Sequence, residues 1–299
     1  MSSRSYGPLL DALRGVRWPA RRAVGAALPG AHRSRQRGSS GEFTEYRLYR
    51  QGDDPRQLDW KLLARSDRAF VRLTDDRALL PTWFAVDGSA SMAFPMQSSD
   101  DDTRATKWHA ACALAVGLAA VAHASADPVG LVVTGRDGPM RLSARARRGT
   151  VGELTRLLDG VVVGGDASLA PLIATIPVMA RVVIVSDLLG DADALVHAAA
   201  QRTAAGGIVE CVHVVAAEEL TLPTGTFLAR DPDAPTVQRP LEARVAVEYR
   251  ARFDAFRAEM ARAWRATGAG YVEARTDAPL ARLVRQIASN VGSEPMAHR

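Results

Sequence analysis

Three oxygen-bearing side chains stand at alternate positions in the segment Asp87-Gly88-Ser89-Ala90-Ser91. In an extended loop, alternate side chains point the same way, so Asp87, Ser89 and Ser91 can face one point. One carboxylate and two hydroxyls make a hard oxygen site, which suits Mg²⁺, with Mn²⁺ or Ca²⁺ as alternatives. The other interpretation is that these side chains cap the following turn through bonds to the backbone. We expect the metal-binding loop.

A second acidic residue, Asp187, directly follows the apolar segment 181–186, just as Asp87 follows the apolar segment 82–86. In open α/β sheets, ligands bind beyond the carboxyl ends of the strands. We therefore expect both carboxylates at one sheet edge, with Asp187 reaching the cation directly or through a water. The intermediate loop 164–168 offers the hydroxyl of Ser168 or the carboxylate of Asp166.

The elements that must position these residues alternate along the chain beyond residue 81. We expect strands at 82–86, 129–134, 139–142, 181–186, 208–215 and 270–274, the third of them at a sheet edge. We expect helices at 106–125, 150–158 with Thr150 as N-cap, 168–176, 191–205, 242–267 and 278–289. This alternation predicts right-handed crossovers and a doubly wound, mainly parallel α/β sheet over residues 81–290.

The chain before residue 81 has a different character. Residues 1–41 hold eight Arg and one acidic residue, Asp11, so the rest of the 299-residue chain carries a net charge of −2, although the whole carries +5. We expect a short helix and a flexible basic stretch over residues 1–40, and a strand-rich appendage over 41–80. Residues 291–299 are expected to form a flexible C-terminus.

The two cysteines, Cys112 and Cys211, lie in apolar stretches without a CxxC motif. They are expected to be buried, reduced thiols of a cytoplasmic protein. No signal peptide is visible, and the longest apolar run, residues 110–122, is shorter than the roughly 20 residues of a membrane span.

The Asp-x-Ser-x-Ser pattern at a strand end, with a later strand ending in Asp, resembles the metal-ion-dependent adhesion site of von Willebrand factor A domains. That resemblance implies a Rossmann-like sheet and a metal held by Asp87, Ser89, Ser91, Ser168 and Asp187. The family uses a Thr from the intermediate loop. Because the loop 164–168 contains no Thr, Ser168 or Asp166 would have to replace it.

The segment Gly52-Asp53-Asp54-Pro55-Arg56-Gln57-Leu58-Asp59-Trp60 resembles the signature of a bacterial family called domain of unknown function 58, and the likeness extends over about residues 30–290. Its charged residues either form an ion-pair network that fastens the appendage to the sheet, which we favour, or help to form a face on which a partner docks. The residues concerned are Asp53, Asp54, Arg56, Asp59 and Trp60, with Arg47 and Arg65 as further members of the network.

The resemblance implies a non-enzymatic protein-binding module. A von Willebrand factor A metal loop leaves one coordination position open for an acidic residue of a partner. The family resemblance further implies that this partner is a MoxR-type AAA+ ATPase, which the chain assists in chaperone-like remodelling or maturation of protein complexes.

Two other functions are open at this point. A metal-dependent hydrolase or phosphatase is one, although Asp87 is followed by Gly88 and Ser89 and so does not begin an Asp-x-Asp pattern. There is also no Gly-x-Ser-x-Gly elbow around Ser89 or Ser91, and the chain has no P-loop. The other is binding of nucleic acid or an anionic membrane surface by the basic N-terminus. Its cations would be Arg14, Arg17, Arg21, Arg22, Arg33, Arg35 and Arg37.

Overall fold

The computed structural model describes residues 5–18, 43–50, 58–66, 68–74, 79–95, 105–221, 227–230, 238–241 and 243–289. The chain forms two compact units, one made of residues 1–23 with 80–299 and the other of residues 24–79. Each unit is considered by itself below.

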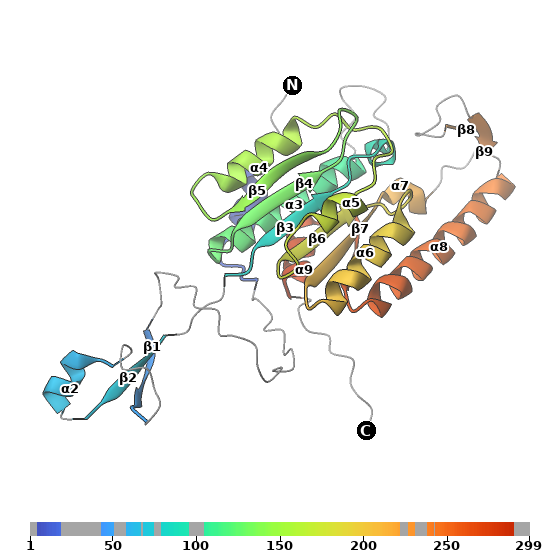
Figure 1. The fold of residues 1–299 in the computed structure, drawn as a ribbon. Coiled ribbons are helices and arrows are strands. Elements are labelled where there is room, and N and C mark those ends of the chain that lie inside the picture. The colour runs from blue at the N-terminus through green and yellow to red at the C-terminus, as the bar shows by residue number, and fades with distance from the viewer. Residues whose placement is uncertain are drawn as a thin grey trace. The chain divides into compact units, whose positions relative to one another are not determined.

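The larger unit is built on a six-stranded sheet (Figure 1). Its strands, in spatial order, are β10 (Gly270–Arg275), β7 (Ile208–Val215), β6 (Arg181–Ser186), β3 (Thr82–Val86), β4 (Val129–Val133) and β5 (Met140–Arg145). All neighbours pair in parallel except β4 and β5, which are antiparallel. The prediction of a mainly parallel α/β sheet with an edge strand near residue 140 is therefore confirmed.

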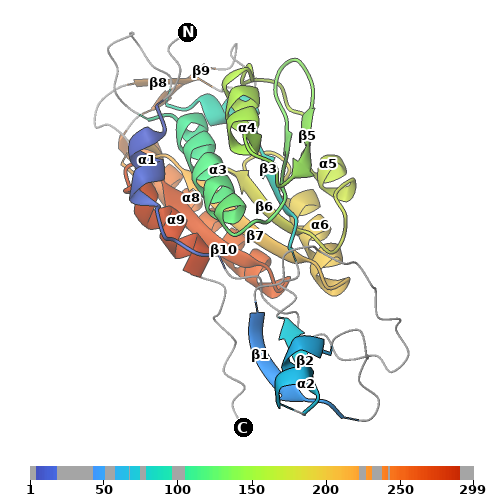
Figure 2. The same cartoon turned by 90° about the vertical axis from the view of Figure 1, so that its left-hand side faces the viewer.

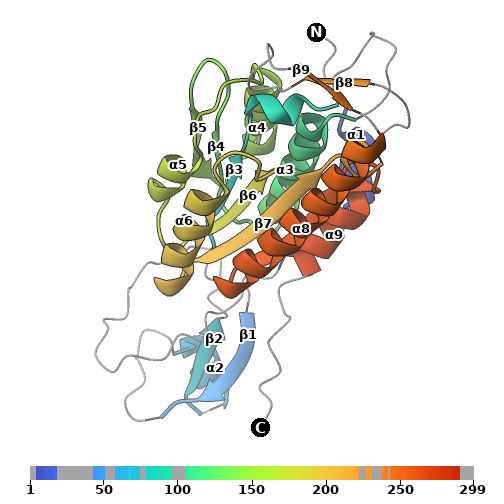
Figure 3. The ribbon, with the colours of Figure 1, turned by 90° about the vertical axis from the view of Figure 1, so that its right-hand side faces the viewer.

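Helices cover both faces of this sheet. One face packs against α1 (Gly7–Ala12), α3 (Lys107–Ala124), α4 (Thr150–Asp159) and α9 (Leu280–Ser289), as Figure 2 shows. The other packs against α5 (Ala170–Ala174), α6 (Ala192–Ala204) and α8 (Ala243–Ala266), which lie in front in Figure 3. The central strands β3 and β6 are buried along their whole length. Helices on both faces explain why these strands are continuous apolar runs.

The predicted N-cap of α4 was wrong. Gly149, with φ of 87°, is the N-cap, and Thr150 is the first helical residue. The Thr150 hydroxyl instead donates to the carbonyl of Arg147, 2.8 Å away. The chain enters this helix through a left-handed residue, a conformation that glycine adopts without steric cost.

The N-terminal segment contributes to the core of the larger unit. Helix α1 packs on α3 and α9. Leu13 and Trp18, which follow it, are buried, and the Arg181 guanidinium lies 4.2 Å from the centre of a Trp18 ring. Residues 5–18 are thus anchored by apolar burial and a cation–π contact. Most of the basic stretch, residues 19–42, lies outside the described residues.

Three described pieces had no counterpart in the prediction. Helix α2 (Trp60–Ser66) accompanies the antiparallel pair of β1 (Phe43–Leu48) and β2 (Phe70–Thr74) in the smaller unit. Strands β8 (Phe227–Arg230) and β9 (Gln238–Leu241) form an antiparallel hairpin before α8. The short helix α7 (Ala217–Leu220) follows β7.

No helix in the described part of the chain is both long and apolar enough to span a membrane.

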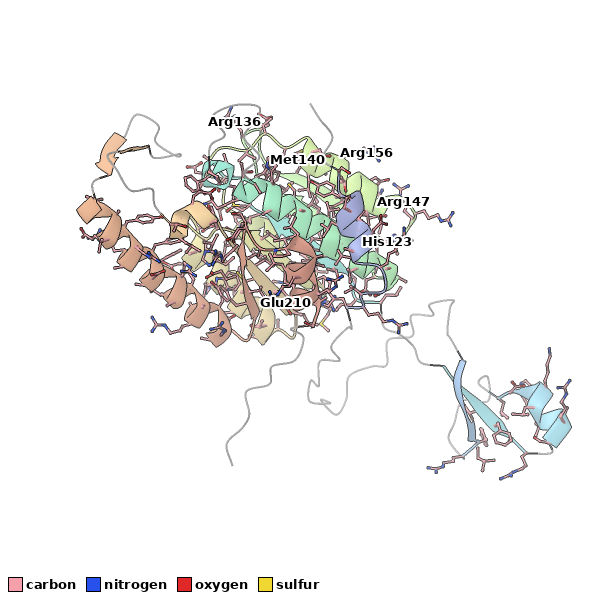
Figure 4. All side chains as sticks on the ribbon, turned by 180° about the vertical axis from the view of Figure 1, so that it is seen from behind. His123, Arg136, Met140, Arg147, Arg156 and Glu210 are labelled. Carbon is pink, nitrogen blue, oxygen red and sulfur yellow. The ribbon has the colours of Figure 1, made fainter. Side chains whose placement is uncertain are left out.

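The carboxyl and amino ends of the parallel strands lie at opposite ends of the larger unit. Arg136 follows β4 at the carboxyl end, whereas Glu210 lies near the start of β7, and Figure 4 shows them at opposite ends of the larger unit.

Candidate metal site

Backbone hydrogen bonds to neighbouring elements hold the loop after β3 in place. The N–H of Asp87 donates to the carbonyl of Val185 in β6 over 2.9 Å. The N–H of Gly88 donates to the hydroxyl of Thr134, at the end of β4, over 3.0 Å. The carbonyl of Gly88 accepts the N–H of Gly164 over 2.8 Å. The loop is therefore fixed from both neighbouring strands and from the loop 161–168.

The predicted oxygen donors of this loop lie together. The Ser186 hydroxyl donates to Oδ2 of Asp87 over 2.7 Å, and the Ser89 N–H donates to Oδ1 over 2.9 Å. The hydroxyls of Ser89 and Ser91 lie 3.2 Å apart, and the 3-10 helix η2 (Ala90–Ala93) begins between them. One Asp87 oxygen thus makes the turn-capping bond that the alternative interpretation required, while all three side chains stay grouped.

A cavity of about 330 Å³ opens beside this loop. Its polar lining comes from the metal loop, from the loop before α5 and from the start of α6, and consists of Asp87, Ser89, Ser91, Asp166, Ser168 and Asp191. The prediction that Ser168 reaches the site from the intermediate loop agrees with this lining. Asp166, the other residue considered there, also lines the cavity.

The second predicted carboxylate, Asp187, is engaged elsewhere. Its Oδ2 lies 2.7 Å from the Nζ of Lys107, and its Oδ1 accepts the N–H of Leu189 over 3.2 Å. The same Lys107 ammonium lies 2.7 Å from Oε1 of Glu219 in α7. Lys107 and Asp187 are 1% and 2% exposed, so this is a buried ion triad. Asp187 is not among the residues that line the cavity.

The charges around the loop are coupled. Burial is the largest cause that raises the pKa of Asp87 above its usual value, and the negative charge of Asp187 is the second. The hydrogen bonds from Ser186 and Ser89 act in the opposite direction and lower that pKa. Burial alone would lower the pKa of Lys107. The charges of Asp187 and Glu219 outweigh it and raise that pKa, which keeps the ammonium charged. Asp187 is therefore close enough to raise the pKa of Asp87, although the Lys107 ammonium balances the charge of Asp187.

The donor set fits a hard divalent cation of modest affinity. Carboxylate and hydroxyl oxygens are the ligands that Mg²⁺ prefers, and Mg²⁺ keeps several waters in such sites. No group of three or more His, Cys, Asp or Glu side chains at metal-binding spacing occurs among the described residues. These ligands therefore match a softer metal such as Zn²⁺ poorly. In a site of this kind the serine hydroxyls must supply much of the coordination.

Sequence reasoning missed three residues of this region: Lys107, Glu219 and Asp191. Lys107 did carry a signal, because it is one of two lysines and stands at the start of an otherwise apolar helix, where a cation opposes the helix dipole. Asp191 precedes α6 and hydrogen-bonds through its Oδ2 to the Ser168 hydroxyl. Nothing local marks Glu219, which sits in a four-residue helix.

The family-signature residues fall in the smaller unit. Oδ1 of Asp59 accepts the N–H groups of Lys61 and Leu62, both at 3.0 Å, and so caps the start of α2. Trp60 is 64% exposed. Asp53, Asp54 and Arg56 lie outside the described residues, so both the ion-pair network and the docking face stay predictions.

A buried histidine lies close to the triad. His213 in β7 is 1% exposed, and its Nδ1 is 2.7 Å from the hydroxyl of Tyr271. Burial lowers its pKa from 6.5 to about 4, although the charges of Glu273 and Asp187 act in the opposite direction. The folded protein therefore holds His213 neutral over a pH range in which the unfolded chain protonates it.

This predicts acid sensitivity. A pKa lowered from 6.5 to about 4 contributes roughly 3 kcal/mol to the free energy of unfolding, which is present above pH 6.5 and lost as the pH falls towards 4. Denaturant titrations of His213→Gln between pH 7 and pH 4.5 should show a shallower loss of stability than the wild type. His197→Gln, at an exposed position of α6, is the control. Equal slopes for wild type and His213→Gln would contradict the prediction.

Comparison with known proteins confirms the family resemblance found in the sequence. The family model described as "Protein of unknown function DUF58" matches residues 45–263. An uncharacterized protein of Mycobacterium tuberculosis (strain ATCC 25618 / H37Rv) is 28% identical over 293 residues, covering 94% of this chain and 89% of its own length. A Mycobacterium bovis protein matches to the same extent.

Among solved structures, two matches of low sequence identity are as follows. BatB from Bacteroides thetaiotaomicron is 15% identical, with a TM-score of 0.45, and the match covers 71% of this chain and 97% of BatB. The von Willebrand factor A domain of SpRpn10 is 13% identical, with a TM-score of 0.39, over 69% of this chain and 93% of that domain.

Proposed function

The chain belongs to the DUF58 family, and from this premise we propose that it is a protein-binding module whose recognition site is the cavity beside β3. A divalent cation, Mg²⁺ in the first instance, is held by Asp87, Ser89 and Ser91 with help from Ser168. The bound cation would offer one open coordination position, which an acidic side chain of the partner can occupy. The chain's own residues orient the cation and shape its surroundings.

The observation that carries this proposal is the grouping of Asp87, Ser89, Ser91 and Ser168 around one open cavity at the sheet edge where α/β proteins bind ligands. A volume of about 330 Å³ corresponds to roughly ten waters, so it has room for a hydrated cation and a partner side chain.

The proposed partner is a MoxR-type AAA+ ATPase, which this chain would assist in remodelling or maturing protein complexes. That part rests on the family resemblance. A non-enzymatic role belongs to the same proposal and also rests on the family resemblance. A cytoplasmic location belongs to the same proposal, and the burial of Cys112 and Cys211 matches the expectation for them.

The test is a binding assay between this protein and a purified MoxR-type ATPase from the same genome, in Mg²⁺ and in EDTA. Asp87→Asn keeps the size of the side chain and removes its charge, so binding in Mg²⁺ should weaken at least about tenfold. Asp193→Asn, on the first turn of α6, removes an exposed charge that does not line the cavity and is the matched control.

Wild-type binding that is the same in Mg²⁺ and EDTA, and unchanged by Asp87→Asn, would reject the metal-dependent mechanism. Turnover of a phosphate ester that requires both Mg²⁺ and Asp87 would instead favour a hydrolase. Thermal unfolding in EDTA should confirm that both variants fold.

A further inference from the structure

The two acidic residues nearest the metal loop differ in their surroundings. Asp187, which directly follows β6, has both carboxylate oxygens occupied, one by Lys107 and one by a backbone N–H. Asp191, four residues later, lines the cavity that Asp87 also lines. Only one of these two carboxylates therefore faces the space in which a cation would sit.

We propose that Asp191, paired with Ser168, supplies the second carboxylate of the cation site in place of Asp187. This inference rests on the proposed function, because it assumes that a divalent cation binds beside Asp87. It divides the ligand set into two halves, both of which line the cavity. One half is Asp87 with Ser89 and Ser91, and the other is Asp191 with Ser168.

The two halves are built alike. In the first, the Ser186 hydroxyl donates its proton to Asp87. In the second, the Ser168 hydroxyl donates its proton to Asp191 and its oxygen accepts the N–H of Ala170 over 3.1 Å. Each carboxylate is thus oriented by a hydroxyl, an arrangement that fixes ligands before a metal binds. The intermediate loop lacks the Thr of related sites, and the Ser168–Asp191 pair offers oxygen ligands there.

Charge balance also separates the two acids. Asp187 and Glu219 share the Lys107 ammonium, so their charges are partly compensated without a metal. The cavity is lined by three carboxylates, those of Asp87, Asp166 and Asp191, and by no basic side chain. Asp87 and Asp191 are partly buried and Asp166 is exposed, and no cation of the protein lines the cavity to balance them. A cation between Asp87 and Asp191 supplies that balance, whereas one placed at Asp187 would be repelled by Lys107.

The side chain of Asp191 accepts a hydrogen bond from Ser168 and does not cap the helix that follows it. It stands at the N-cap of α6, but its side chain makes no capping hydrogen bond. Asp191→Asn therefore leaves the helix start intact and removes one charge from the cavity. Asp193→Asn removes the same charge two residues later at an exposed position and is the matched control.

The experiment is a calorimetric titration of the full chain with Mn²⁺, compared between wild type and the Asp191→Asn, Asp187→Asn, Asp193→Asn and Asp87→Asn variants. We expect Asp191→Asn to weaken Mn²⁺ binding at least about tenfold, as removal of a ligand does, and Asp187→Asn and Asp193→Asn to change it less than about threefold. Ser168→Ala, which removes the partner of Asp191, should also weaken binding. Unfolding temperatures measured with and without Mn²⁺ give a second readout for each variant.

The outcomes separate the two proposals. Loss of binding in Asp187→Asn, with Asp191→Asn equal to the wild type, overturns the ligand assignment and leaves the proposed function standing. No Mn²⁺ binding by the wild type overturns both. If Asp191→Asn does not fold, Asp191→Ser decides between the two acids, because it also removes the carboxylate and keeps a residue that is favourable at an N-cap. A Mn²⁺ affinity equal to that of the wild type in that variant overturns the assignment.

Discussion

Lys107→Met should lower the free energy of unfolding by about 3–5 kcal/mol, because removing one partner of a buried ion group leaves the others uncompensated. Lys107 is 1% exposed and lies 2.7 Å from both Asp187 and Glu219. Methionine keeps most of the volume of the side chain, so the loss reports the charge rather than a cavity. Urea titration followed by circular dichroism measures it.

The chain offers a natural control, since its only other lysine, Lys61, is exposed on α2. Lys61→Met should change stability by less than about 0.5 kcal/mol, as expected for an exposed position. The triple variant Lys107→Met, Asp187→Asn, Glu219→Gln removes all three charges and should recover much of the loss. A Lys107→Met variant as stable as the wild type would show that the triad does not hold β6 and α7 together.

Gly88→Ala should destabilise the larger unit by about 4 kcal/mol, above the usual 1–3 kcal/mol for overpacking. A Cβ added at Gly88 would lie 2.2 Å from the carbonyl oxygen of Thr134 and 3.1 Å from its carbon. These are backbone atoms of the neighbouring strand end, which cannot turn aside as a side chain can. The loop would have to move, and Asp87 and Ser89 would move with it, so Mn²⁺ binding should be lost as well.

Gly152→Ala is the control for that substitution. Gly152 lies within α4, and a Cβ there would have no heavy atom within 4 Å. Because alanine is the better helix former, this variant should gain about 0.5–1 kcal/mol of stability. Denaturant titrations of both variants, with Mn²⁺ affinity measured in parallel, give opposite signs if the structure is right. A Gly88→Ala variant that keeps both stability and Mn²⁺ affinity would contradict the close approach of β3 and β4 at this loop.

The sequence by itself determined the elements of the sheet and the oxygen-rich loop. The strands at 82–86 and 181–186 are buried on both faces, so their residues are almost all apolar. Such a strand can be predicted from its own sequence, without knowledge of the strands beside it. Asp87, Ser89 and Ser91 belong to one short loop, so their spacing alone predicted that they would lie together. Thr150 shows the limit of such local reasoning, because the preceding glycine took the cap position.

Only the tertiary structure decided which acid faces the cavity. Asp187 meets a lysine 80 residues earlier in the chain and Glu219 meets the same lysine across 112 residues, while Ser168 meets Asp191 across 23. Such pairings depend on the order of strands, with β3 between β4 and β6, and on which way each side chain leaves its loop. Hydrophobic periodicity carries no record of either, because it reports only how each segment faces the core.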